Sequence, residues 1–149
     1  MSADKAFFDT NVLLYAYSNA DAGKQARALA LYREYAQQGR MLLSTQVVQE
    51  FFVAAVRKLS LPQQHVREIA GTLLDSPLIV VSPSHIRAAM DHVDHYKTSF
   101  WDALIVAAAE SGGVGVLFTE DLNDGQQYGA VVARNPFRVT DPVSTVVRQ

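Results

Sequence analysis

The stretch that decides the fold is "KAFFDTNVLLYAYS", residues 5–18, in which a short apolar run meets the carboxylate of Asp9 and a second apolar run follows at once. Residues 5–8 are typical of a buried β-strand, and residues 11–17 begin a helix. A strand that leads directly into a helix is the first half of an α/β unit. Asp9 lies at the junction, where it either caps the helix or contributes to a polar site, and this residue alone does not decide between the two.

The rest of the chain continues this alternation. Further strands are predicted at 40–44, 77–82, 114–119 and 130–134, and further helices at 26–38, 46–59, 62–75, 82–96 and 99–113. Parallel strands need a crossover, and a helix is the usual one. The sequence therefore predicts an α/β fold with a mainly parallel central sheet of four to five strands flanked by helices.

Composition sets the class of protein. The chain has 149 residues, of which 49% are hydrophobic and 19% charged, as expected for one globular domain. A formal net charge of -2 provides no overall attraction for nucleic acid, so such a partner would have to be held by a local patch or a bound cation. The absence of cysteine excludes disulfides and thiolate sites. No apolar run is long enough to span a membrane, and we expect a soluble, cytoplasmic protein without a membrane partner.

Acidic residues recur where ligands bind in such folds. Asp9 and the "TED" of residues 119–121 each follow a predicted strand, and parallel sheets bind ligands at the carboxyl ends of their strands. Asp102 is the one charge in the otherwise apolar "FWDALIVAAA", with no Lys or Arg beside it. A capping box with Ser99 is the structural alternative for Asp102. An uncompensated buried carboxylate is costly, so Asp102 indicates that a cation from outside the chain binds beside it.

The remaining acids are more ambiguous. Glu50 lies at the edge of the polar stripe of its helix, where spacing alone favours a solvated side chain or a pair with Arg57. In "FTEDLNDG", residues 118–125, Glu120, Asp121 and Asp124 crowd one loop, and at least one of them is expected to shape a turn.

Several carboxylates at one end of a sheet repel one another and raise each other's pKa. A hard divalent cation, Mg²⁺ or Mn²⁺, removes this conflict, because it prefers oxygen ligands and keeps positions open for water and phosphate. It can then activate water and neutralise the leaving oxygen of a phosphodiester. The acids therefore favour nuclease-like chemistry.

Five segments resemble a known family in order and spacing. "FFDTNVLLYA" (7–16), "LSTQVVQEFF" (43–52), "SFWDALIVAAA" (99–109), "FTEDLNDGQ" (118–126) and "NPF" (135–137) are similar to PIN domains, specifically VapC-type toxins. The resemblance implies a three-layer PIN-like sandwich in a single domain, 1–149, with 138–149 as a short C-terminal extension. It also implies a metal-dependent endoribonuclease, the toxin of a type II toxin–antitoxin pair.

The resemblance assigns roles residue by residue. It implies a catalytic quartet, with Asp9 and Asp102 as the first ligands of Mg²⁺ or Mn²⁺ and with Asn11 and Thr119 orienting ligands or substrate. Further metal ligands would come from Glu50, Asp121 and Asp124. The quartet comprises Asp9, Glu50, Asp102 and Asp121.

Partners follow from the same resemblance. VapC-type toxins form homodimers, cleave RNA and bind an antitoxin in a hydrophobic groove. The segments "ALALYREY" (28–35) and "VVQEFFVAAV" (47–56) carry more apolar residues than one sheet face needs, as a groove or dimer interface would require.

Other interpretations remain open at the level of sequence. A haloacid-dehalogenase-like phosphatase would need an acid where this chain has Asn11. A PIN nuclease could serve RNA processing without an antitoxin, and a non-catalytic binding module would use its acids only for caps and turns. Phe100 and Trp101 are expected in the core rather than stacked on a base, and His85, His92 and His95 on a helix surface.

Overall fold

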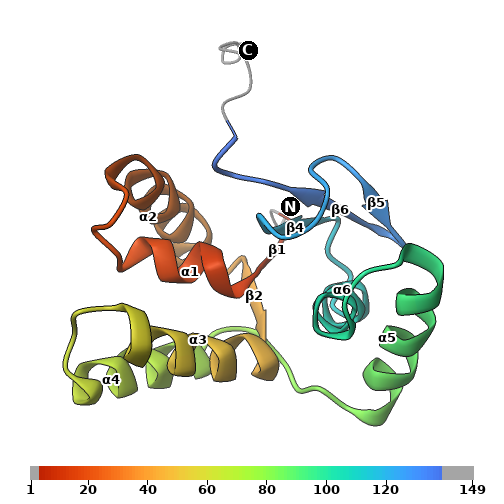
Figure 1. Cartoon of the computed structure of the whole chain (residues 1–149), viewed down its shortest axis with the longest axis horizontal. Coiled ribbons are helices and arrows are strands. Elements are labelled where there is room, and N and C mark those ends of the chain that lie inside the picture. Colours follow the sequence, from red (N-terminus) through yellow and green to blue (C-terminus); the bar gives the residue numbers. More distant parts are fainter. Residues whose placement is uncertain (1–3, 139–149) are drawn as a thin grey trace.

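The computed structural model describes residues 4–138, which form a six-stranded sheet and six helices (Figure 1). In chain order the elements are β1 (Ala6–Phe8), α1 (Thr10–Ala16), α2 (Ala22–Gln37), β2 (Met41–Ser44), α3 (Thr45–Lys58), α4 (Gln63–Leu74), β3 (Leu78–Ile79), α5 (Pro83–Tyr96), α6 (Phe100–Ser111), β4 (Val116–Phe118), β5 (Gln127–Tyr128) and β6 (Val131–Arg134). The predicted α/β class and mainly parallel sheet are confirmed.

The strand order, β3-β2-β1-β4-β6-β5, places β1 between β2 and β4. Phe7 pairs in parallel register with Leu42 of β2 and Leu117 of β4. Helices α1 and α2 lie on one side of these strands, and α5 and α6 on the other (Figure 1). The chain leaves β1 for β2 in one direction and returns to β4 in the other, so the β1–β4 boundary is where open α/β sheets form a ligand crevice.

The structure differs from the sequence-based expectation at the sheet edges. The strand expected at 77–82 is limited to Leu78–Ile79, because the Val81 N–H donates to the Thr45 hydroxyl at 3.1 Å instead of to a neighbouring strand. The short strand β5, antiparallel to β6, was not predicted. Helix α2 begins earlier than expected, capped by the Asp21 carboxylate, which accepts from the Lys24 N–H at 3.0 Å. Of the extension predicted at 138–149, residues 139–149 lie outside the described residues.

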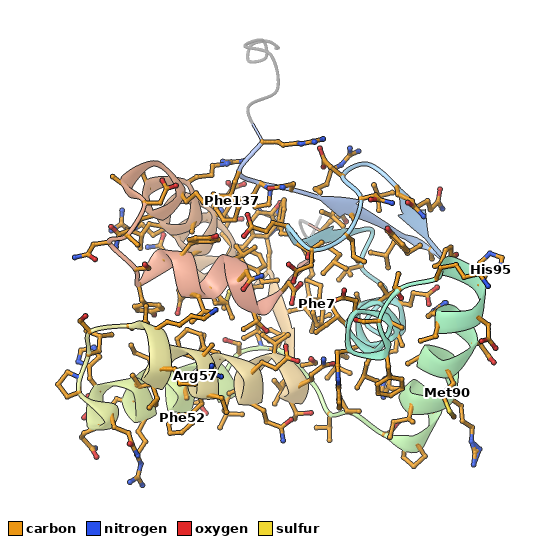
Figure 2. All side chains as sticks on the ribbon, in the orientation of Figure 1. Phe7, Phe52, Arg57, Met90, His95 and Phe137 are labelled. Carbon is orange, nitrogen blue, oxygen red and sulfur yellow. The ribbon has the colours of Figure 1, made fainter. Side chains whose placement is uncertain are left out.

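A buried aromatic cluster supports the start of the chain. Phe7 and Phe8 are fully buried, and Phe7 lies at the centre of the molecule (Figure 2). The rings of Phe8, Tyr35 and Phe118 meet edge to face, with centroids 5.4–5.5 Å apart. These contacts fix the ends of β1 and β4, where Asp9 and Thr119 follow.

In the described part of the chain, every helix is too short or too polar to cross a bilayer.

Candidate acidic site

Asp9 joins the ends of the two central strands. It is the N-cap of α1 and is only 5% exposed. One carboxylate oxygen accepts from the Thr10 N–H at 2.7 Å, and the other accepts from the Thr119 hydroxyl at 2.7 Å. Asp9 therefore has both roles considered for it: it caps a helix and it faces the end of β4.

The environment of Asp9 disfavours its charge. Burial raises its pKa to about 7, while the hydrogen bonds from Thr119 and Thr10 act in the opposite direction. The negative charges of Asp121 and Asp102 raise the pKa further. Three of the four predicted acids are therefore close enough to influence one another.

Asp102 enters the same region from the first turn of α6. The Ser99 hydroxyl accepts from the Asp102 N–H at 3.1 Å, so Ser99 caps the helix, which is one half of the capping box considered from the sequence. Burial raises the pKa of the Asp102 carboxyl, followed by the charge of Asp121 and, more weakly, that of Glu50. The cap and the acidic site are in contact, because a hydrogen bond with the Ser99 side chain also acts on the Asp102 carboxyl and lowers its pKa.

Glu50 turns toward this site and away from Arg57, the alternative partner that spacing alone favoured. Its two carboxylate oxygens accept from the Thr10 hydroxyl at 2.9 Å and from the Gln46 amide at 3.1 Å. Within residues 4–138 no ion pair links Glu50 to Arg57, which lies two turns further along α3 (Figure 2).

Gln46 is a site residue that the sequence did not single out. It is 5% exposed, and its amide donates both to Glu50 and to the Trp101 carbonyl at 3.1 Å. Its own carbonyl oxygen has no protein partner among the described residues. Gln46 thus links α3 to the start of α6, and its position one turn before Glu50 was the only available signal.

Asp121 is oriented by the two residues predicted to orient groups in the site. The Asn11 amide lies 3.1 Å from both Asp121 oxygens, and the Thr119 hydroxyl accepts from the Asp121 N–H at 3.1 Å. Although Asp121 lies at the exposed rim, partial burial raises its pKa, and the neighbouring Glu120 charge adds to the shift.

The other acids of the loop have structural partners. Glu120 accepts from Lys24 at 2.9 Å and from the Tyr15 hydroxyl at 2.7 Å. Asp124 accepts from the Asn135 N–H at 2.8 Å and so supports the turn at 135–137. The expectation that the loop includes acids with a structural role agrees with this geometry, and the further role of Asp124 as a metal ligand stays a prediction.

Trp101 departs from the expectation for the core. It is 62% exposed, and its ring meets Phe100 edge to face with centroids 5.2 Å apart. The continuous buried run of α6 begins only at Ala103, so the first turn of the helix extends beyond the covered part of the sheet. The expectation of a buried Trp101 is therefore wrong.

The donor set suits a hard cation in its chemistry. The site offers carboxylate oxygens whose pKa values are raised, in part by one another, which is the conflict that a divalent ion removes. No group of three or more Asp, Glu or His side chains in residues 4–138 meets the geometry of a ready-made metal cluster. An ion held by one or two carboxylates and by water, as is usual for Mg²⁺, fits these residues.

The sequence matches the family model of the PIN domain over residues 6–124. Comparison with curated protein sequences finds no match. Among solved structures, a toxin–antitoxin complex from Klebsiella pneumoniae is 23% identical, with a TM-score of 0.66 over 89% of this chain and 98% of that one. Mycobacterium tuberculosis VapC20, a sarcin-ricin loop cleaving toxin, is 16% identical, with a TM-score of 0.65 over 86% and 99%. DNA-bound VapBC from Salmonella typhimurium is 16% identical, with a TM-score of 0.64 over 90% and 99%. At these identities the likeness establishes the fold.

Proposed function

This chain belongs to the PIN domain family, and on that premise we propose that it is a metal-dependent endoribonuclease, the toxin of a toxin–antitoxin pair. One observation carries the proposal: acids from four elements, spread over more than 110 positions of sequence, converge where β1 and β4 end, and the pKa values of Asp9, Asp102 and Asp121 are raised there. A purely structural set of caps and turns would not need this convergence, which costs stability unless a cation is bound.

Asp9 and Asp102 would hold Mg²⁺ or Mn²⁺, with Glu50 and Asp121 completing the pocket. When bound, the cation supplies an activated water and neutralises charge on the scissile phosphodiester. The protein supplies position. Thr119 and the backbone of Thr10 hold the Asp9 carboxylate, and Asn11 holds that of Asp121.

Glu50 is the residue best arranged to move a proton. Both of its oxygens accept from neutral donors, the Thr10 hydroxyl and the Gln46 amide, so the side chain is fixed without being paired to a cation. A fixed carboxylate of this kind can accept a proton from the attacking water.

The toxin role is supported by the kinds of protein that share the fold. One solved neighbour is a toxin–antitoxin complex, one is DNA-bound VapBC, and one is a toxin that cleaves the sarcin-ricin loop. We propose a homodimer that acts on RNA in the cytoplasm and is held by a cognate antitoxin in a hydrophobic groove. The exposed Val53 and Val56 on α3, at 55% and 37%, and a hollow between the ends of α2 and α4 offer apolar surface for such contacts.

The nuclease activity is tested with the purified full chain, total bacterial RNA and Mn²⁺. We expect cleavage that EDTA abolishes and that falls by at least about 100-fold in Asp9→Asn and Asp102→Asn, because each change removes a transition-state interaction. Asp91→Asn, which removes an exposed acid of α5, is the matched control and should cleave normally. Cooperative melting of each variant shows that it is folded. Full cleavage by folded Asp102→Asn would contradict the proposal.

The toxin role needs a separate test. Induced expression in a bacterial host should arrest growth, and co-expression of a small protein encoded beside this chain should restore it. Cleavage in vitro with no effect on growth would instead favour a PIN nuclease that serves RNA processing without an antitoxin.

A further inference from the structure

Trp101 is the largest apolar side chain that the described residues leave mostly in water. It is 62% exposed, and it is the only tryptophan in the chain. An exposed indole at the start of a helix that is otherwise buried from Ala103 onward contributes nothing to the core. A single exposed apolar side chain needs no partner in itself, so the inference rests on what lies next to Trp101.

Trp101 adjoins the acidic site through its backbone and its neighbour in the chain, and its ring is held by a second aromatic side chain. It immediately precedes Asp102 in the first turn of α6. Its carbonyl accepts from the buried Gln46 amide, which also donates to Glu50. Its ring rests edge to face on Phe100, which packs against the buried Ala103 and Leu104. The backbone of Trp101 is thus tied to the same network that fixes a quartet carboxylate.

We propose that the Trp101 indole is a stacking platform for an unpaired base of the RNA whose backbone reaches the acidic site. This inference rests on the proposed nuclease function and adds the form of the substrate to it. Single-stranded nucleic acids are recognised through aromatic faces, because every base has a π-surface that is free only when the base is unpaired.

The negative charge of the site makes an uncharged contact with RNA useful. The chain carries a net charge of -2, and the site itself is a cluster of carboxylates, so phosphates are repelled wherever a cation does not intervene. Stacking on a neutral ring supplies affinity that does not depend on charge. A base on Trp101 would place its adjacent phosphate next to Asp102 and at the same time disfavour duplex RNA, whose bases are already stacked.

Because Trp101 is the sole tryptophan, its fluorescence reports directly on the ring. We expect saturable quenching when a single-stranded ten-nucleotide RNA is added to the full chain in Ca²⁺. The same RNA closed into a duplex, and an abasic strand of equal length, should leave the emission unchanged. Binding of labelled RNA, detected by anisotropy, with no change in emission would overturn the proposal. Quenching that depends on protein concentration without RNA would mean that a second copy covers the ring, and would overturn it equally.

Two substitutions separate stacking from simple apolar contact. Trp101→Phe keeps an aromatic face, and Trp101→Leu keeps only apolar bulk. We expect Trp101→Leu to raise Kd and KM for single-stranded RNA roughly 5- to 100-fold, and Trp101→Phe to raise them by no more than about threefold. Met90→Leu alters another exposed apolar side chain, 53% exposed on the outer side of α5, and should change neither constant (Figure 2).

The distribution of the effect between kcat and KM distinguishes the two proposals. Trp101→Leu should act on KM, whereas Asp102→Asn should act on kcat. Unchanged binding and cleavage by Trp101→Leu would overturn the stacking platform and leave the nuclease in place. A wild-type chain that binds RNA with quenching but cleaves none in Mn²⁺ would overturn the nuclease and retain the platform. Equal losses in the Phe and Leu variants would show that an aromatic face does not preserve binding, and would overturn the stacking platform.

Discussion

Asp9 shows how one residue serves the fold and the site at once. Its carboxylate caps α1 through the Thr10 N–H and reaches across to Thr119, the residue that follows β4. The fold thereby buries the Asp9 carboxylate. Burial destabilises its charged form, and this raises its pKa to about 7. Without a cation, Asp9 destabilises the folded state whenever it is ionised.

This cost predicts a pH-dependent effect of Asp9→Asn. Because the folded-state pKa of Asp9 is raised from 3.8 to about 7, the wild type loses stability as the pH rises between these values and loses no more above them. Asparagine keeps an oxygen for the cap and does not titrate. We expect the free energy of unfolding of Asp9→Asn, relative to wild type, to increase by roughly 2–3 kcal/mol between pH 5 and pH 8, measured by urea denaturation in EDTA.

Asp91→Asn is the control, since this exposed acid should show no such increase. A difference between Asp9→Asn and wild type that stays constant with pH would show that Asp9 ionises in the folded protein as readily as in the unfolded chain.

The sequence predicted the role of a residue where its position in a helix or strand determines its neighbours. Asp9 and Asp102 follow from the carboxyl end of a strand and from an apolar helix without a cation. Thr10 could not be assigned as a partner of Glu50, nor the Trp101 carbonyl as a partner of Gln46, because those bonds depend on how α3 packs against α1 and α6. Trp101 was misplaced because apolar character does not indicate where the covered part of a helix begins.

At the scale of elements, α6 has a different constraint at each end. Its first turn carries Ser99, Trp101 and Asp102 toward the site. Its last residues approach the sheet so closely that a Cβ on Gly112 would lie 2.3 Å from Leu42 Cδ2 and 3.6 Å from Ile79 Cδ1. The missing side chain lets α6 pack onto β2 and β3 and so fixes the position of its acidic end.

Gly112→Ala should therefore destabilise the protein by about 1–3 kcal/mol, because the added methyl group overpacks this contact. Gly71→Ala is a matched substitution within α4, where a Cβ would meet nothing within 4 Å. It should stabilise by about 0.5–1 kcal/mol, because alanine is the better helix former. Thermal unfolding of both variants checks the prediction, and equal effects of the two substitutions would contradict it.

The limits of the long helices were predictable, whereas of the two shortest strands β3 was expected to be longer and β5 was not expected. Helices α3, α5 and α6 show their periodicity and caps in the sequence, so their limits agree with prediction to within a few residues. Strands β3 and β5 have two residues each, too few to show alternation. They exist because β2 and β6 offer free edges in the folded molecule.

At the scale of the whole molecule, the site is a concentration of negative charge in a chain that is otherwise close to neutral. Its acids come from β1–α1, α3, α6 and the loop after β4. A cation that reduces their repulsion therefore holds all of these elements together. A bound ion should therefore stabilise the protein globally.

We expect Mn²⁺ to raise the Tm by roughly 5–10 °C at a concentration of 100 times Kd. With the Mn²⁺ concentration fixed at 100 times the Kd measured at pH 8, the rise should be larger at pH 8 than at pH 5.5, because Asp9 with a pKa of about 7 is protonated at the lower pH and the ion must displace that proton. Differential scanning calorimetry checks both statements. Asp9→Asn should lose most of the rise, and an equal rise at both pH values would show that Asp9 is not a ligand.

The pairing of β1 with β4 has a consequence for the synthesis of the chain. Asp9 and Thr119 are 110 positions apart, and Asn11 meets Asp121 across the same interval. A ribosome must therefore translate the chain as far as Asp121 before the pocket can close. A nascent chain that ends before Thr119 contains Asp9 without these partners, so whatever this pocket does to RNA, such a chain cannot do it to the transcript that encodes it.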